Sequence, residues 1–369
     1  MPVSKKLKFV NQEKTTESTT TNSSFVSQGT LLDADKLVAG HDYVMVGWIN
    51  CTSPGTNDGA TKFSFESTPP QDLPGALYQR HDTNSSGMYV GHIGQFTCPT
   101  PPTGIGVYRR RVAGSNDEHT GYGQCFAIDL SYSGASGGMV SGTDFSSSQN
   151  LSERTVATNG TLDTHTVNND AGSNLVLAVT RVYDSLNTVL VGLYINDVLV
   201  SSGSRYISDA ADVKSVLFAG AYNLSNGDTV KMKNLDADDA TTDYTYTFTL
   251  NLDDAPQTSH TGQLTSWNEY PGSGSWGTAT IDGNGHESFI VGMGRQTVTG
   301  AESGRMAAIS LKDNTSNQWL LFNERPSGDF NPIYFPATNP GTTVGQLETA
   351  VIVGVGTIGD SDTIEMTTI

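Results

Sequence analysis

The stretch Val189–Gly203 reads VLVGLYINDVLVSSG, two apolar runs separated by Asn196 and Asp197. Both runs are rich in β-branched residues, which favour extended strands. A two-residue loop between antiparallel strands needs positive φ at both central residues. Asn accepts this conformation, whereas Asp197 stands where Gly would be more favourable. The stretch predicts a β-hairpin with its turn at residues 196–197.

Strand signals of the same kind recur from Phe25 towards the C-terminus, bounded by Gly, Asn, Asp and Pro clusters. No stretch shows a 3.6-residue apolar stripe with helix caps at both ends. We therefore predict an all-β protein of tandem antiparallel β-sandwich or jelly-roll domains. The clearest further strands are expected at Tyr43–Cys51, Lys62–Glu66, Gly87–Phe96, Gly106–Val112, Cys125–Tyr132, Asn174–Tyr183, Val216–Ala221, Thr229–Met232, Tyr244–Leu252, Gly277–Ile281, Ser288–Gly292, Arg305–Leu311, Gln318–Asn323, Ala350–Val355 and Thr363–Met366.

The 369 residues are more than one core usually holds, so two sandwiches and a terminal arm are expected. The sequence DDAPQTSHTG at 253–262 interrupts the strands, which gives one sandwich over 25–254 and a second over 255–369. Residues 1–24 are too polar to join a core and predict a flexible N-terminal arm. The arm is either a frayed terminus or a docking tether, with these residues as its anchors: Lys5, Lys6, Leu7, Lys8 and Phe9.

The charge balance excludes several partners. The chain has 20 Lys and Arg against 38 Asp and Glu, a formal charge of −18, which repels phosphate backbones and anionic lipid headgroups. No segment reaches the roughly 18 apolar residues of a membrane span, and MPVSKKLKF lacks the apolar run of a secretory signal. We expect no nucleic-acid partner, no membrane association and no classical secretion.

Two internal echoes suggest tandem construction. Val216–Met232 aligns without gaps on Ala350–Met366, and Gly40–Gly47 shares a Gly-His start and a Val-Gly end with Gly285–Gly292. Duplication explains both echoes, but so does convergence, because Gly and Asp recur in strand-turn-strand segments for backbone reasons. The identical pairs in the longer echo include Gly220 with Gly354, Asp228 with Asp362, Thr229 with Thr363 and Met232 with Met366.

The segment 174–235 resembles the second half of a laminin-G-like, concanavalin A-type jelly roll. Such domains carry a strand, a hairpin with an Asn-Gly turn, and a later strand with a small-residue end. The resemblance implies a jelly-roll fold that serves in sugar-binding modules, glycosidases and virion components. The corresponding stretches are NLVLAVTRVYD (174–184), VLVGLYINDVLVSSG (189–203), SVLFAGAY (215–222) and DTVKMKNL (228–235), with YVMVGWINCT (43–52) similar to an opening strand.

The chain is long, polar and rich in predicted strands, with a Lys-bearing N-terminal arm and no signal peptide. In these features it also resembles virion proteins of tailed bacteriophages, such as capsid decoration proteins, head fibres and tail-associated adhesins. The resemblance implies a non-enzymatic structural protein on the particle surface, with other virion proteins as partners. Lysines that protect sheet edges are scarce beyond residue 40, so neighbouring copies are expected to cover some edges. We predict a homo-oligomer, with a trimer favoured over a dimer, and Thr363–Met366 as a buried or interfacial edge strand.

Catalytic patterns are not convincing. Concanavalin-type glycosidases need paired carboxylates, usually as Glu-x-Asp-x-Glu, and this triplet does not occur. Gly134–Gly138 fits G-x-S-x-G and Gly354–Gly359 fits G-x-G-x-x-G, but neither precedes a helical sequence. We expect no enzyme activity, no catalytic residues and no cofactor.

The seven histidines are scattered, and no metal site is predicted. Calcium at Asp236–Asp239 competes with the interpretation of a solvated acidic loop. Cys51, Cys98 and Cys125 are interpreted as buried thiols, although Cys98 could form a bridge with either of the others. Arg109, Arg110 and Arg111 alternate in facing along a strand and are expected to pair with acids across a domain or subunit contact.

Aromatic residues in the C-terminal part suggest an alternative function. Trp267, Tyr270 and Trp276 lie in the loop-like sequence WNEYPGSGSW, and Trp319 follows further along. Exposed Trp and Tyr can stack on sugars or anchor a protein interface, whereas burial under a loop is the structural alternative. The alternative function is a carbohydrate-binding module or adhesin that recognises a host-surface glycan.

Overall fold

The computed structural model describes residues 8–14, 16–53, 58–75, 79–81, 85–115, 117–134, 137–183, 188–206, 213–252, 274–280, 286–299, 305–312, 319–321, 333–335, 344–358 and 363–368. Among these residues the 3₁₀ turn η1 (Ala34–Lys36) is the one helical element, and all other regular structure is β-strand. The predicted all-β class is confirmed. No helix in the described segments is long and apolar enough to cross a membrane.

The first part of the described chain folds into two sheets. One sheet has the order β1-β10-β4-β8, with β2 also on β10, and the other runs β3-β9-β5, with β6 and β7 both on β5. All of these pairings are antiparallel. The strands are β1 (Lys8–Lys14), β2 (Ser18–Thr20), β3 (Val26–Leu32), β4 (Asp42–Ser53), β5 (Asp58–Phe65), β6 (Gln71–Asp72), β7 (Gln79–His81), β8 (Ser85–Thr97), β9 (Ile105–Ala113) and β10 (Glu118–Asp129).

The next part repeats this arrangement, with the single strand β18 in the place of β6 and β7. Its sheets have the orders β13-β21-β16-β19, with β14 also on β21, and β15-β20-β17-β18. The short hairpin β11 (Ser133–Gly134) and β12 (Gly137–Gly138) connects the two parts. The strands are β13 (Phe145–Asn150), β14 (Arg154–Val156), β15 (Thr161–Thr166), β16 (Gly172–Tyr183), β17 (Thr188–Ile195), β18 (Val198–Tyr206), β19 (Val213–Leu224), β20 (Thr229–Asn234) and β21 (Ala240–Asn251).

The C-terminal strands follow the same order again, as far as they are described. β23 pairs with β27, and the second sheet runs β22-β28-β24-β25, with β26 also on β24. Two four-stranded sheets in this order form a jelly roll, so the described residues form two jelly rolls and the corresponding core of a third. The strands are β22 (Gly274–Thr280), β23 (His286–Thr299), β24 (Arg305–Lys312), β25 (Trp319–Leu321), β26 (Ile333–Phe335), β27 (Val344–Ile358) and β28 (Thr363–Thr368).

Both sequence echoes fall on equivalent strands of different rolls. Val216–Met232 covers β19 and β20, and Ala350–Met366 covers β27 and β28, where the chain crosses from one sheet of a roll to the other in each case. Gly40–Gly47 and Gly285–Gly292 likewise lead into equivalent strands, β4 and β23. Equivalent position along the whole topology favours duplication over local convergence.

Side chains in the first two rolls support this equivalence. Phe9 on β1 packs against Phe126 on β10, with ring centroids 5.6 Å apart and an interplanar angle of 41°. Phe145 on β13 packs against Phe248 on β21 at 5.9 Å and 37°. Phe9 lies opposite Ile128, and Phe145 lies opposite Leu250, so the two aromatic pairs occupy the same register in their rolls.

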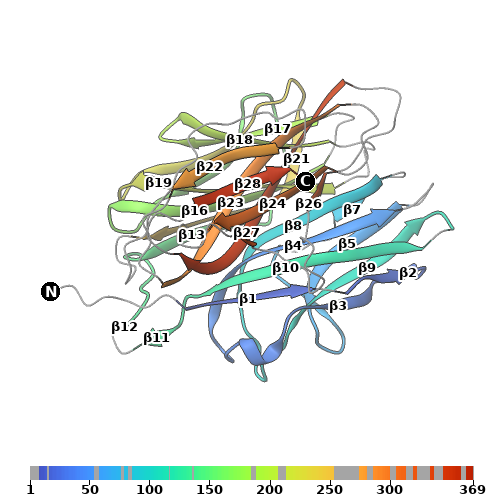
Figure 1. The fold of residues 1–369 in the computed structure, drawn as a ribbon. Helices are drawn as coiled ribbons and strands as arrows, with labels where there is room; N and C mark the ends of the chain where they lie inside the picture. Colours follow the sequence, from blue (N-terminus) through green and yellow to red (C-terminus); the bar gives the residue numbers. More distant parts are fainter. Residues whose placement is uncertain are drawn as a thin grey trace.

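Each roll contacts the other two, so the three rolls form a closed ring. Figure 1 shows the first roll in blue and cyan, the second in green and yellow, and the third in orange and red. β7 of the first roll lies against β19 of the second, β18 of the second against β27 of the third, and β26 of the third against β8 of the first. At the first of these contacts Arg80 pairs with Val213, so one sheet of each roll continues into the other. The strands β8, β19 and β27 also touch one another where the rolls meet.

We call the sheets that contain β4, β16 and β23 the inner sheets, because a core shared by the rolls covers them. This central core holds Val46 and Trp48 of the first roll, Leu177 and Phe248 of the second, and Val351 of the third. Two further cores fill the interiors of the first and second rolls, between their inner and outer sheets. The inner sheets of the first two rolls are therefore buried on both faces.

Three expectations about the fold have clear outcomes. Asn196 and Asp197 have φ of 50° and 65°, so the predicted hairpin turn is confirmed. The flexible arm over 1–24 is wrong for residues 8–14 and 18–20, because they are strands that complete the inner sheet beside β10. The single sandwich expected over 25–254 is instead two rolls, since the strand order repeats at β13 and not near residue 253.

Removal of residues 1–14 should destabilise the protein, because it deletes β1 and uncovers the Phe126 ring. We expect the free energy of unfolding to fall by on the order of 2 kcal/mol or more, in the range of other losses of a packed Phe. Urea denaturation measures this loss. Removal of residues 1–7, which leaves β1 whole, is the control. An equal stability of both truncated chains would restore the interpretation of residues 8–14 as a loose arm.

Candidate functional site: the junction of the three rolls

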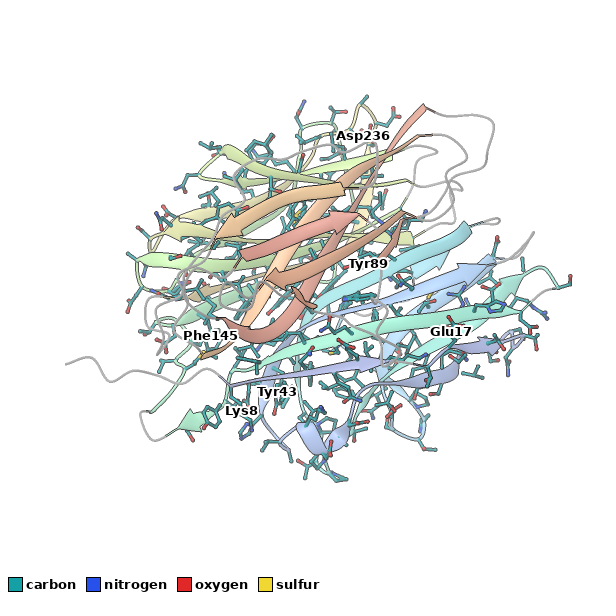
Figure 2. The ribbon with its side chains drawn as sticks, in the orientation of Figure 1. Lys8, Glu17, Tyr43, Tyr89, Phe145 and Asp236 are labelled. Carbon is teal, nitrogen blue, oxygen red and sulfur yellow. The ribbon has the colours of Figure 1, made fainter. Side chains whose placement is uncertain are left out.

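The residues predicted for docking and glycan binding are dispersed. Lys8 and Phe9 lie in β1, where the Lys8 ammonium is 5.5 Å from the centroid of the Tyr132 ring. Phe9 packs against the central core. Figure 2 marks Lys8 at the start of this strand. Lys5, Lys6 and Leu7 lie outside the described residues.

The four predicted aromatic residues do not form one cluster in the described backbone. Trp267 and Tyr270 lie outside the described residues. Trp276 is in β22, at a register shift in its pairing with β28, and Trp319 is in β25. Since β28 and β24 separate these two strands, the strands lie about 14 Å apart at the usual strand spacing, and the two Trp positions are at opposite edges of one sheet.

A junction of buried side chains joins the three rolls instead. Arg205 on β18 is fully buried and donates from Nη2 to the carbonyl oxygen of Tyr89 at 2.7 Å. Its guanidinium carbon lies 5.7 Å from the centroid of the Tyr89 ring. The Tyr89 hydroxyl donates to the carbonyl oxygen of Val351 at 3.0 Å. One residue from each roll thus meets at a single point, which Figure 2 marks at Tyr89.

The Tyr89 hydroxyl is the polar group of this junction that joins the first roll to the third. Burial raises the pKa of the Tyr89 hydroxyl, which therefore stays a donor at neutral pH. The same oxygen lies 3.4 Å from the backbone nitrogen of Val351, so one hydroxyl serves both polar groups of that residue. Trp48 stacks on the ring at 6.3 Å, and Met293 packs against the central core from the third roll.

Tyr244 of the second roll is inserted into the first. Its hydroxyl donates to the carbonyl oxygen of Ile93 at 2.9 Å, and its ring stacks on His92 with centroids 5.6 Å apart. Gly75 lies in the break between β6 and β7 with φ of 69°, where a Cβ would overlap the Tyr244 ring. The gap between β6 and β7, with Gly75 in it, therefore makes room for the Tyr244 side chain of the neighbouring roll.

Gln79 and Gln95 add hydrogen bonds across the same contact. Gln79 donates from Nε2 to Gly91 at 2.6 Å within the first roll, and its Oε1 accepts from the backbone of Ser215 in the second at 3.3 Å. Gln95 accepts from the Ser147 hydroxyl at 3.1 Å. Polar side chains therefore fix the register of the two rolls, while the apolar core supplies most of the buried area.

A second buried cluster contains a Ser next to a His, the two residue types that form the nucleophile and its base in serine hydrolases. The Ser146 hydroxyl oxygen lies 3.0 Å from His165 Nε2, 2.8 Å from Asn169 Oδ1 and 2.8 Å from the Thr249 hydroxyl oxygen. All four side chains are buried inside the second roll. Because the backbone N–H of Asn168 also donates to this hydroxyl, Ser146 serves as a hub of a closed hydrogen-bond network.

The weak catalytic patterns fall in strands. Gly134 and Gly137 pair in the hairpin β11–β12, so the G-x-S-x-G match follows no strand-to-helix turn. Residues 354–358 of the G-x-G-x-x-G match belong to β27, which pairs with β23. Neither arrangement provides the helix N-terminus that the corresponding chemistry needs.

The arginine cluster alternates as predicted, but its partners differ from the expectation. Arg109 is fully buried and donates to the Thr61 hydroxyl at 3.0 Å and to Glu118 Oε2 at 2.5 Å. Arg110 points to the other face, where its guanidinium carbon lies 4.9 Å from the centroid of the Phe25 ring. The prediction of an ion pair across a domain or subunit contact is wrong for Arg109, because Glu118 belongs to the same roll.

The cysteines and acidic residues have structural environments. Cys51, Cys98 and Cys125 are buried free thiols, as predicted. Asp236 accepts a hydrogen bond from the backbone N–H of Ala237 at 2.6 Å, and burial raises its pKa. In the described part of the chain, no group of three His, Cys, Asp or Glu side chains is placed to hold a metal ion.

Sequence reasoning missed Tyr89, Arg205 and Tyr244. One available signal was the apolar character of strand β4, YVMVGWIN at 43–50, which has no polar alternation and is typical of a strand covered on both faces. The signal points to a second packing surface, but it does not identify the residues that contact it. Arg205, in the polar stretch SSGSRY, has no signal of its own.

Comparison with protein-family models and with curated proteins gives no match. Weakly similar solved structures include BuGH86 in complex with neoagarooctaose, at TM-score 0.23 and 10% identity, covering 62% of this chain and 34% of that chain. The tandem CBM22 domains of Paenibacillus barcinonensis Xyn10C align at TM-score 0.20 and 9% identity, covering 66% and 93%. A protein of an archaeal virus, described by its triple jelly roll fold and turret assembly, aligns at TM-score 0.22 and 10% identity, covering 99% and 88%.

The chain thus spans about a third of the length of BuGH86. At these TM-scores and identities, the three alignments assign no function to this chain.

Tyr89→Phe should loosen the third roll, because it removes the hydroxyl that contacts Val351 and keeps the ring. We expect a loss of about 1 to 3 kcal/mol in the free energy of unfolding, the cost of leaving a buried polar group without its partner. Limited proteolysis should release fragments of the third roll sooner.

The control is Tyr43→Phe, which removes a buried hydroxyl within 3.3 Å of Asp129 inside the first roll. This variant should lose stability without faster release of the third roll. Equal proteolysis patterns for the two variants would argue against the junction.

Acidification should destabilise the protein through its buried histidines. Burial lowers the pKa of His92 to about 3 and that of His165 to about 4, from an ordinary value of 6.5. Below pH 6.5 the unfolded chain therefore binds protons that the folded chain does not. The free energy of unfolding should fall as the pH falls, by about 2 kcal/mol for each histidine at pH 5.

Urea denaturation at pH 7 and at pH 5 measures this dependence. His165→Gln loses hydrogen bonds at both values, but its stability should change by about 2 kcal/mol less between them. A pH dependence identical to that of the unaltered protein would mean that His165 is not held neutral in the fold.

Proposed function

We propose that this chain is a non-enzymatic structural protein of a virus particle. The observation that carries the proposal is the closed ring of three jelly rolls around one shared core. Such a ring is a rigid block with repeated outer surfaces, suited to contacts that recur on a symmetric shell. Jelly rolls serve in viral capsids and in lectins, so the fold is compatible with both of these classes of function.

Three features of the chain favour a structural role. Two clusters of residue types that also occur in catalytic sites, Ser146 with His165 and Arg109 with Glu118, are buried in networks that hold strands together. The junction of Arg205, Tyr89 and Val351 fixes the rolls to one another. The charge of −18 suits a protein displayed at high local density, because like-charged surfaces resist non-specific aggregation.

In finer terms, we propose a bacteriophage protein of the capsid decoration or fibre type, on the particle surface, with other virion proteins and further copies of itself as partners. Three features of the sequence support a bacteriophage surface protein: many short strands, polar loops and few lysines. The laminin-G-like assignment of 174–235 stays a prediction. Within that segment the turn at 196–197 has the backbone conformation that the resemblance implies.

The alternative is a carbohydrate-binding module or adhesin. It is supported by the aromatic residues of the third roll, where Trp276 lies at a strand irregularity in β22. A glycan array with the unaltered chain and with Trp267→Ala and Trp276→Ala separates the two proposals. Loss of a binding signal in the variants would favour the glycan function, since stacking contributes about 1 kcal/mol for each ring.

Mass spectrometry of purified particles tests the virion proposal. Peptides of this chain should co-purify with particles through a density gradient and remain after a high-salt wash. Peptides of an abundant host protein should be lost in the same wash, which controls for adhesion. Absence of the chain from every particle fraction would overturn the proposal.

A further inference from the structure

The contact between the first and second rolls contains a buried histidine. His92 on β8 is 3% exposed, and it stacks on Phe63 of β5 in the interior of the first roll, with ring centroids 6.2 Å apart. Tyr244 of the second roll stacks on the same imidazole at 5.6 Å and an interplanar angle of 25°. A residue of the second roll therefore helps to cover a titratable group of the first.

The imidazole is enclosed without a hydrogen bond at one of its nitrogens. His92 Nε2 is buried and has no hydrogen-bond partner among the described residues. A Cβ at Gly94, on the same strand, would stand 2.6 Å from this nitrogen and 3.1 Å from the Tyr244 hydroxyl oxygen, so the three groups are closely packed. A proton added to the ring would place a positive charge in a buried site, which is costly without an acceptor.

The charge that acts on His92 has the same sign as a protonated imidazole. Burial, and in second place the positive charge of Arg181 on β16, lower the pKa of His92 to about 3. Arg181 is itself paired with Asp243, the neighbour of Tyr244 on β21, and donates from Nε to Oδ1 at 2.6 Å. Burial raises the pKa of the Tyr244 hydroxyl, which stays neutral. The closed contact therefore admits only the neutral imidazole.

Other described side chains on the strands that pack at this contact do not offset a charge on His92. β7 contributes Gln79, which is neutral and donates to the carbonyl oxygen of Gly91. The further described charges on or beside these strands have partners or face another interior: Lys62 pairs with Asp72, Arg109 pairs with Glu118, and Lys214 lies opposite Val182, which packs in the core of the second roll.

The strand pairing at this contact is short. β7 pairs with β19 through one residue pair, Arg80 with Val213, and the Ser215 N–H adds a hydrogen bond to Gln79 Oε1 at 3.3 Å. The hydrogen bond from Arg205 to Tyr89 comes from another strand, β18, and does not involve Tyr244. Release of Tyr244 therefore leaves the first and second rolls joined at the junction.

We propose that this contact is an acid-sensitive switch, in which a proton taken up by His92 releases Tyr244 from the first roll and parts β7 from β19 while both rolls stay folded. In the open form water reaches the imidazole, so its pKa returns to the ordinary value of 6.5. The closed form therefore has its full stability above pH 6.5 and loses it as the pH falls from 6.5 towards 3.

The inference goes beyond the virion proposal and does not rest on it. It also differs from general acid unfolding, because opening is confined to one contact of the ring. His165 cannot serve the same switch, since it is buried inside the second roll and bonded to Ser146, so that roll itself must open before His165 takes up a proton.

Hydrogen exchange of the Ser215 amide tests the switch, because this N–H donates across the contact. The protection factor of the amide, corrected for the intrinsic exchange rate at each pH, measures how often the contact opens. In the unaltered chain it should fall about 25-fold between pH 7 and pH 5, given a pKa of about 3 in the closed form and 6.5 in the open form.

Three variants assign the effect to named side chains. His92→Phe keeps a ring for stacking and removes the titration, so the protection of Ser215 should be nearly equal at both pH values; His92→Gln is a second, smaller replacement with the same expected result. His165→Gln is the matched control and should keep the 25-fold fall. Tyr244→Phe loses the hydrogen bond to Ile93, so it should lower the protection at both pH values and keep the fall.

Unfolding of the whole chain would give a different pattern. Both buried histidines would then contribute, so the protection of Ser215 in the unaltered chain would fall roughly 500-fold, and the His92 and His165 variants would reduce this fall equally. That pattern overturns the inference. It is also overturned by equal protection of the unaltered chain at pH 7 and pH 5, or by unchanged protection in Tyr244→Phe.

Discussion

The inner sheets of the first two rolls are each buried between two apolar cores, and this constraint governs the architecture. In the first roll, Met45 faces the roll interior, whereas Val46 faces the core shared with the other rolls. A roll standing alone would leave the second face in water, at a cost of about 25 cal/mol for each Å² of apolar surface. The rolls are therefore obligate neighbours, and the closed ring is the arrangement that covers all described inner sheets together.

The sequence predicts the local structure better than the assembly. The hairpin at 196–197 and the alternation of Arg109 with Arg110 follow from backbone and pleat geometry, which short stretches determine. The sequence does not mark the boundary between the first two rolls, because the connection at β11–β12 has the same Gly and Ser composition as turns within a roll. The sequence does not predict strand β1, because KFVNQEK is mostly polar and only its two apolar residues, Phe9 and Val10, pack against the cores.

The candidate site depends on contacts between segments far apart in the chain. Arg205, Tyr89 and Val351 belong to three rolls, and nothing local distinguishes them from other residues in strands. The echoes between rolls contain this information indirectly, since they indicate repeated units that must pack in equivalent ways. An interpretation of the echoes as repeated rolls predicts a core that the rolls share. It does not predict which side chains lie at the centre of that core.

The position of β1 has a consequence for the order in which the protein is made. Each of the first two rolls begins with a strand whose partner is the last strand of the same roll, as Phe9 with Phe126 and Phe145 with Phe248 illustrate. During synthesis, at about 5 to 20 residues per second, an emerging first strand waits for several seconds or more without its partner. The nascent chain thus carries an unpaired aromatic strand until its roll is complete. Slow translation would lengthen the period in which neighbouring nascent chains on one messenger could exchange these strands.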